Sequence, residues 1–157
     1  MRTLIIYDTK HGATQKAAVM IAENLKEKPE VINLKKAKVP KIDGYDFILI
    51  GGSIHMGKVQ KSIKKFINNN KSILKKKRMG LFISCGYHEN SDDYFNVILG
   101  ESLYKHATVK ADIGYAYYLE KMNTVYRKMI IEFAKIDESV ESFNLDEIKM
   151  ITNYING

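Results

Sequence analysis

Two short runs of uninterrupted apolar residues constrain the fold of this chain more than any other feature. They are residues 4–7, with the sequence LIIY, and residues 47–50, with the sequence FILI. A segment that is apolar at every position, rather than at every second one, indicates a strand buried on both faces of a sheet. Residues 31–34 and 80–84 are two further predicted strands, and residues 108–117, interrupted by Gly114, are a fifth.

Helical patterns separate the predicted strands. Apolar residues recur at helical spacing from Ala18 to Leu25, and helices are also predicted over residues 59–67, 93–105 and 119–133. A capping box of Asn144 and Glu147 begins a last helix. Strands that alternate with helices need crossover connections, which produce a parallel sheet. We therefore expect an α/β fold in three layers, with a doubly wound five-stranded parallel sheet, formed by residues 1–157 as one domain.

Composition narrows the class of protein. The chain has a single cysteine, Cys85, and no apolar run approaches the roughly 20 residues that span a membrane. One cysteine excludes an internal disulfide and suits a reducing compartment, so we expect a cytoplasmic protein. No spacing of histidines, cysteines and carboxylates indicates a metal site, and no group of side chains indicates a catalytic triad.

Positive charge is concentrated in one segment of the chain. The net charge is +7, and residues 58–78 contain nine basic residues and no acidic one. The favoured interpretation is the solvated face of a helix; the alternatives are contact with an acidic partner or with an anionic membrane surface. Nucleic acid is not expected as a partner, because no zinc spacing, recognition helix or aromatic-rich RNA-binding motif accompanies the charge.

The segment that follows the first predicted strand suits a phosphate group. It consists of Thr9, Lys10, His11, Gly12, Ala13 and Thr14. Gly12 permits a tight backbone path, and the helix that follows directs unpaired N–H groups and a positive dipole end at this loop. With two threonine hydroxyls as further donors, the loop is predicted to bind a dianion; the alternative is an ordinary helix N-cap. Its spacing matches neither the nucleoside triphosphate loop nor the dinucleotide fingerprint.

Two further loops follow predicted strands and carry unusual side chains. The second loop begins with Gly51 and continues as Gly52, Ser53, Ile54, His55, Met56 and Gly57, and the third contains Cys85, Gly86, Tyr87 and His88, with Tyr94 nearby. Glycines let a backbone approach a flat ligand, and a tyrosine can stack on an aromatic ring system. Because ligands of such sheets bind outside the carboxyl ends of the strands, we expect all three loops to form one site.

The first loop resembles the T-x-x-G-x-T loop with which the flavodoxin family binds the phosphate of FMN. Thr9, Gly12 and Thr14 match that pattern. In the family the next two loops wrap the isoalloxazine ring, which implies that His55 and Met56 flank the ring on one side and Tyr87 or Tyr94 on the other. The resemblance covers the whole chain in element order and implies FMN as the cofactor and the strand order 2-1-3-4-5. Lys10 and His11 would strengthen the binding of the phosphate.

Within that family the chain is similar to the menaquinone-dependent protoporphyrinogen oxidase branch. The shared features are a basic residue at Lys10, the run G-x-S-I-x-x-G at residues 51–57 and an aromatic-rich run at residues 114–118. The oxidase has a long insertion after the strand that ends here at Ser84, whereas this chain has only a short loop and a helix there. In size the chain is therefore closer to a minimal flavodoxin, although typical flavodoxins are acidic and this chain is basic.

Three hypotheses about function follow. The first is an FMN-binding redox protein that exchanges electrons with a redox partner protein or a small-molecule donor or acceptor, at a potential less negative than in acidic flavodoxins. The second is a quinone-dependent oxidase of a porphyrinogen, with the helix at residues 119–133 lying against a membrane or packed on the sheet. The third is a flavin-free module that binds a partner through residues 58–78.

Overall fold

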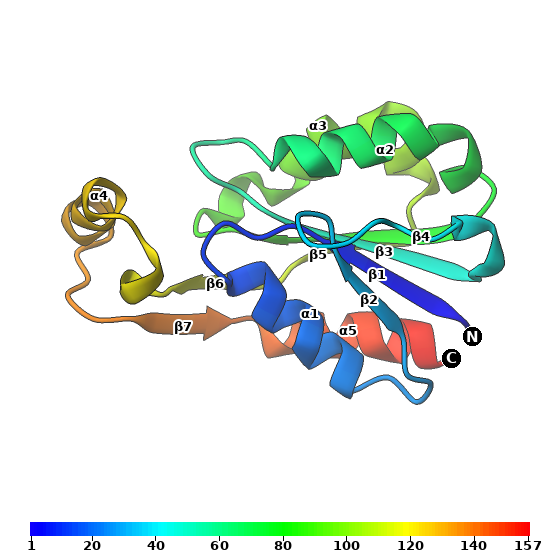
Figure 1. Ribbon diagram of the computed structural model, residues 1–157, viewed down its shortest axis with the longest axis horizontal. Coiled ribbons are helices and arrows are strands. Elements are labelled where there is room, and N and C mark those ends of the chain that lie inside the picture. Colours follow the sequence, from blue (N-terminus) through cyan, green and yellow to red (C-terminus); the bar gives the residue numbers. More distant parts are fainter.

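Five parallel strands form the central sheet of the computed structural model, which describes residues 1–157 (Figure 1). Their order is β2-β1-β3-β4-β5, as the resemblance implied. The strands are β1 (Thr3–Tyr7), β2 (Glu30–Asn33), β3 (Phe47–Ser53), β4 (Arg78–Ser84) and β5 (Val109–Asp112). The predicted doubly wound α/β fold is confirmed. Because every pairing is parallel, the carboxyl ends of β1, β3 and β4 meet at one edge of the sheet.

Helices cover both faces of the sheet (Figure 1). Helices α1 (Ala13–Glu23) and α5 (Leu145–Asn156) lie on one face, and α2 (Lys61–Leu74) and α3 (Ser91–His106) lie on the other. On α2 the buried positions are Ile63, Phe66, Ile67 and Leu74, whose spacing forms one helical stripe. Burying each such side chain stabilises the fold by about 1.5–3 kcal/mol.

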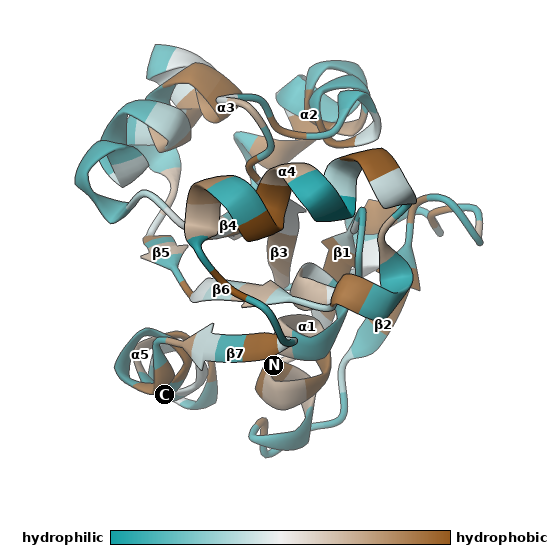
Figure 2. Ribbon diagram, turned by 90° about the vertical axis from the view of Figure 1, so that its left-hand side faces the viewer, coloured by the Kyte–Doolittle hydropathy of each residue, from teal (hydrophilic) through white to brown (hydrophobic).

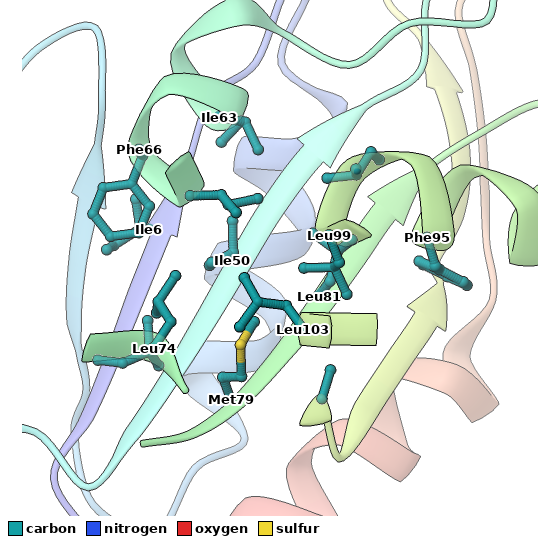
Figure 3. Packing of buried hydrophobic residues seen from close by; sticks show 14 of the residues in the cluster. Ile6, Ile50, Ile63, Phe66, Leu74, Met79, Leu81, Phe95, Leu99 and Leu103 are labelled. Atoms are coloured by element: carbon teal, nitrogen blue, oxygen red, sulfur yellow. The ribbon is translucent and has the colours of Figure 1, made fainter. Parts of the chain in front are cut away.

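The core between the sheet and the helices α2 and α3 is built from large aliphatic side chains (Figure 3). Ile6, Ile50 and Leu81 extend from three neighbouring strands toward Ile63 and Leu103 of the two helices, and all five are fully buried. Close packing also explains one of the glycines on the opposite face. A Cβ atom at Gly51 would overlap the ring of Phe82 on the adjacent strand, so only glycine fits there.

The predicted single strand over residues 108–117 is wrong. Strand β5 ends at Asp112, and the chain turns at Gly114, which has a φ of +83°. Residues from Gly114 onward form β6 (Gly114–Tyr117), which pairs antiparallel with an unpredicted strand, β7 (Val140–Phe143), in a separate two-stranded ribbon. A Cβ atom at Gly114 would overlap the carbonyl oxygen of Ser142, and the Gly114 N–H donates to Asp112 Oδ1 at 3.1 Å.

The ribbon carries a helix beyond the edge of the sheet. This helix, α4 (Thr124–Ala134), follows a short 3₁₀ turn and lies across the carboxyl ends of β1, β3 and β4 instead of packing on a sheet face (Figure 2). The predicted helix over residues 119–133 therefore starts five residues later. The 30-residue segment 114–143, between β5 and α5, contains the ribbon and this helix and adds no strand to the five-stranded sheet. No helix is both long enough and apolar enough to cross a membrane.

Candidate functional site

The three predicted loops meet around one cavity at the carboxyl edge of the sheet. The cavity has a volume of about 240 Å³, and most of its lining side chains are apolar or aromatic. The residues that line it from the predicted loops are Thr9, His11, Ala13, Ser53, Ile54, His55, Met56, Gly57, Cys85, Gly86, Tyr87 and Tyr94. Lys10, Gly12 and Thr14 belong to the first loop but do not line the cavity, and neither do Gly52 and His88.

The first loop presents an open helix start. Gly12 has a φ of +106°, and its N–H donates to Thr9 Oγ1 at 2.9 Å, which closes the loop on itself. Helix α1 begins at the next residue without a side-chain cap and without an acidic residue in its first turn. Thr14 is fully buried, yet its hydroxyl has no hydrogen-bond partner. A buried polar atom without a partner destabilises a fold by about 1–3 kcal/mol, so this geometry fits a bound phosphate.

Cationic side chains surround the first loop. The Nζ atom of Lys121 lies 3.0 Å from the position that a Cβ atom on Gly12 would occupy. Lys35 donates to the Thr9 carbonyl at 3.2 Å and forms an ion pair with the fully buried Asp8, also at 3.2 Å. Asp8 also accepts a hydrogen bond from the Ser62 hydroxyl. The charge of Lys35 thus compensates the carboxylate beneath the loop, and Lys121 remains available to an anion.

A strained turn forms the second loop. The N–H of His55 donates to the Lys58 carbonyl at 2.9 Å, and the Lys58 N–H donates back at 3.0 Å. The two residues between them have positive φ angles, 49° at Met56 and 74° at Gly57, as in a type I′ turn. Met56 is 85% exposed, so a non-glycine residue holds an unfavourable conformation at the mouth of the cavity.

The predicted start of the second loop is wrong by three residues. Gly51, Gly52 and Ser53 are the last residues of β3, and each is buried. A Cβ atom at Gly52 would lie 2.5 Å from Val59 Cγ2, so this glycine serves the packing of the following segment.

His55 connects the second loop to α4. Its Nε2 atom lies 3.0 Å from Ser53 Oγ and its Nδ1 atom lies 2.8 Å from the Tyr126 hydroxyl. Because Gln60 Nε2 already donates to Ser53 Oγ, the serine proton is free to point at Nε2, which leaves the imidazole proton on Nδ1. Burial, with smaller contributions from the charges of Lys10, His11 and Lys35, lowers the pKa of His55 to about 4, so the ring is neutral at pH 7.

Tyr126 also contacts the first loop. Its ring centroid lies 4.8 Å from that of His11, and Lys10 Nζ lies 4.4 Å from the Tyr126 centroid in a cation–π contact. Burial is the main cause that lowers the pKa of His11, with smaller contributions from Lys10 and Lys35. One tyrosine of α4 therefore joins two loops that are more than 40 residues apart in the sequence.

The third loop contributes one buried and one exposed side chain. Cys85 is buried, its Sγ accepts from the Tyr87 N–H at 3.4 Å, and burial raises the pKa of the thiol. Tyr87 is 75% exposed at the mouth of the cavity. His88 points away and pairs with Asp112 at 2.7 Å. Tyr87 and Tyr94 thus line the cavity, whereas His88 lies outside it.

A fourth wall of the cavity was not predicted. It consists of residues from β6, from α4 and from the segment between them: Tyr115, Ala116, Tyr117, Met122, Tyr126, Met129, Ile130 and Phe133. The sequence signals for it were the aromatic-rich run at residues 114–118 and the amphipathic stripe of residues 119–133. The stripe predicted a helix face that another surface covers, but it did not identify that surface. The structure shows that this face is directed at the site.

Comparisons with known proteins agree with this architecture. The sequence matches the flavodoxin domain family over residues 4–143. It is 32% identical over 73 residues to the protoporphyrinogen IX dehydrogenase [quinone] of Escherichia coli K12, a match that covers 45% of this chain and 40% of that relative. The match thus spans only two fifths of the relative's length.

Solved structures share the fold at low sequence identity. The two-electron reduced flavodoxin of Megasphaera elsdenii superposes with a TM-score of 0.59 and 22% identity, covering 71% of this chain and 85% of that one. A Lactobacillus acidophilus flavoprotein in complex with FMN superposes with a TM-score of 0.51 and 19% identity, covering 73% and 91% of the two chains.

Proposed function

Because the chain belongs to the flavodoxin domain family, we propose that it is a redox protein that binds FMN at the three loops and transfers electrons through it. The observation that carries this proposal is the fully buried Thr14 hydroxyl, which has no partner and stands at the uncapped start of α1. Phosphate oxygens would accept from that hydroxyl and from the first N–H groups of the helix. No side chain of the protein accepts a hydrogen bond from the Thr14 hydroxyl or caps the start of α1.

Each part of the site has a separate task in this proposal. The first loop, from Thr9 to Thr14, holds the phosphate, and Lys121 adds a positive charge beside Gly12. The loop residues 54–57 and 85–87, with Tyr94, flank the ring system. FMN supplies reversible transfer of one or two electrons when it is bound. The apolar side chains of α4 exclude water from the ring, which strengthens every electrostatic interaction within the site.

The charges around the site favour a reduced and anionic ligand. His55 is neutral at pH 7 and neither adds nor removes charge, and Lys35 is paired with Asp8, whereas Lys10 and Lys121 are cations within or beside the first loop. Positive charge near a ligand stabilises its anionic form. We therefore expect a flavin potential less negative than in acidic flavodoxins. A strongly negative value in a spectroelectrochemical titration would contradict this expectation.

An absorption spectrum of the purified protein tests the proposal. We expect a flavin band that survives removal of excess FMN, with quenched flavin fluorescence. Riboflavin, which lacks the phosphate, is the matched control and should bind more weakly if the first loop binds the phosphate. A colourless protein that does not retain FMN would refute the proposal and leave a flavin-free binding module as the remaining hypothesis.

Oxidation of a porphyrinogen with a quinone as electron acceptor is a second candidate. Two observations favour it: the identity to the Escherichia coli dehydrogenase and the apolar wall of α4, which gives the site a covered, water-poor side. The test is the appearance of porphyrin fluorescence when the FMN-loaded protein is mixed with protoporphyrinogen and menaquinone under anaerobic conditions. If FMN is retained and no porphyrin forms, the result supports the FMN-binding redox function and contradicts the porphyrinogen oxidase function.

A further inference from the structure

Helix α2 has lysines at its N-terminal end, where positive charge destabilises a helix. Lys61 and Lys64 lie in its first turn, which has no acidic residue, and Gln60 provides no side-chain cap. The N-terminal end of a helix is the positive end of its dipole, so cations there are unfavourable. Lys61 is also three and four residues from Lys64 and Lys65, spacings at which like charges repel each other.

The helix dipole explains the lysines at the carboxyl end of α2, but it does not explain those at the N-terminal end. Lys71, Lys75 and Lys76 lie at or next to the carboxyl end, where the dipole favours cations. The N-terminal lysines and Lys58 are exposed, and none of them has a carboxylate within ion-pair distance. Asp92 and Asp93, at the start of the neighbouring α3, make no ion pair with them either; Asp92 accepts instead from the Tyr104 hydroxyl at 2.7 Å. The carboxylate at the start of α2 is the buried Asp8, which accepts from the Ser62 hydroxyl and is ion-paired with Lys35 rather than with a lysine of this cluster.

This lysine cluster lies beside the mouth of the cavity. Lys58 is hydrogen-bonded through its backbone to His55, which lines the cavity. Gln60, immediately before α2, accepts from the Ser53 N–H at 3.0 Å, which fixes the start of the helix to the second loop. The exposed Met56 lies in the turn between His55 and Lys58. An exposed apolar side chain next to polar and charged residues is typical of a protein–protein contact.

We propose that Lys58, Lys61, Lys64 and Lys65, here named the basic rim, dock an acidic redox protein that exchanges electrons at this site. The inference rests on the proposed function and names the partner by its charge. A redox protein gains from docking at the mouth of the cavity because its own centre then lies near the ligand. The outward residues further along α2, Asn68, Asn69 and Ser72, are polar, so the exposed side of this helix offers no apolar anchor for a membrane and no aromatic ring for a nucleic acid base.

The experiment compares two triple variants of equal net charge. Lys61→Glu, Lys64→Glu and Lys65→Glu together reverse the basic rim, and Lys26→Glu, Lys28→Glu and Lys149→Glu reverse exposed lysines elsewhere on the surface. The probe is a reduced, acidic plant-type [2Fe–2S] ferredoxin, which donates one electron per encounter to the FMN-loaded protein. Stopped-flow absorbance at about 20 mM ionic strength gives the second-order rate constant, and calorimetry gives ferredoxin binding to the protein with and without FMN.

We expect reversal of the basic rim to lower the rate constant at least about tenfold and the control to lower it less than about twofold, since steering acts mainly through charges near the contact. The difference should close at about 0.5 M salt, where screening is strong. The basic-rim variant should also unfold at a higher temperature than the natural protein, because it removes the unfavourable charges at the helix start. That rise shows that a lower rate does not come from misfolding.

Several outcomes would overturn the inference. If both triple variants lower the rate constant equally, the effect comes from the overall charge and not from the basic rim. If the rate constant does not change in either variant, the basic rim does not dock ferredoxin. If the rim variant instead loses binding to phosphatidylserine vesicles or to duplex DNA while ferredoxin kinetics stay the same, the rim serves a membrane or a nucleic acid. A protein that retains no FMN contradicts the proposed function, whereas the calorimetric comparison still decides the docking surface.

Discussion

Helices α1 and α5 lie side by side on one face of the sheet, yet they begin in opposite ways (Figure 1). Helix α5 begins with Asn144, whose Oδ1 accepts from the Glu147 N–H at 3.3 Å, and with two carboxylates in its first turn. Helix α1 begins with Gly12, without a side-chain cap and without an acidic residue. At α5 a side chain of the protein itself accepts a hydrogen bond from an N–H group at the helix start, which stabilises the fold. At α1 the N–H groups have no such acceptor and can bind a ligand.

The other face of the sheet repeats this contrast. Helix α3 has Asp92 and Asp93 in its first turn, and its last turn contains Lys105 and His106, in agreement with the helix dipole. Helix α2 has lysines where α3 has carboxylates. The open start of α1 and the lysine-rich start of α2 follow the first and second loops of the cavity, whereas α3, whose Tyr94 also lines the cavity, follows the third. The helix starts around the site therefore differ in charge from one loop to the next.

The largest effect is expected from acid, which should lower the free energy of unfolding through the histidines in the loops before α1 and α2. The start of α5 has no histidine. The pKa of His55 is about 4 in the folded protein against 6.5 when unfolded. Between these values the unfolded state binds more protons, so the free energy of unfolding falls as pH falls, by about 2–3 kcal/mol in all. Urea titrations of the ligand-free protein from pH 7 to 4 should show this, and His55→Gln should remove most of it. Parallel curves for the two proteins would contradict the prediction.

Substitution of Thr14 by valine sharpens the comparison at α1. The side chain keeps its shape and loses the hydroxyl, so FMN should bind roughly thirtyfold more weakly, equivalent to about 2 kcal/mol for a hydrogen bond to a charged group. The ligand-free protein should be as stable as before or more so, because the buried hydroxyl has no partner. Fluorescence titration measures both ligands, and riboflavin affinity should not change. Equal losses for FMN and riboflavin would show that Thr14 does not contact the phosphate.

The reverse result is expected at α5. Asn144→Ala removes the cap of the helix and should lower the free energy of unfolding by about 1 kcal/mol. The backbone bond from the Asn144 N–H to the Ile113 carbonyl remains in the variant. FMN affinity should stay within a factor of two, as measured by the same titration. A large loss of affinity would show that the two helix starts are not independent, which would break the comparison.

The smallest effect is expected at α2. Lys61→Glu should raise the free energy of unfolding by about 0.5 kcal/mol, because a carboxylate then replaces an ammonium group at the positive end of the dipole. Lys75→Glu, at the opposite end of the same helix, is the matched control and should lower it by a similar amount. Denaturation at low and high salt measures both changes, and both should fade with salt. Destabilisation by Lys61→Glu would mean that a neighbour within the fold does hold this lysine.

Much of the fold could be predicted because its signals are local. The apolar runs at residues 4–7 and 47–50 are buried on both faces, which only a sheet covered on two sides allows. The spacing of Thr9, Gly12 and Thr14 after the first strand predicted an anion-binding loop with an ordinary helix N-cap as the alternative, since a helix start binds anions through its own backbone. Those features need no information about distant parts of the chain.

The arrangement of residues 114–143 depended on contacts far apart in the sequence. Strands β6 and β7 have four residues each, and one side of their ribbon is half-exposed, so neither shows an alternation of apolar and polar residues long enough to predict a strand. Their paired residues are also more than 20 positions apart in the sequence. The stripe on α4 required a covering surface, but an amphipathic pattern does not identify its partner. Only the folded chain brings Tyr126 to His55, 71 residues away, because the turn at Gly114 directs the ribbon over the carboxyl edge of the sheet instead of along it.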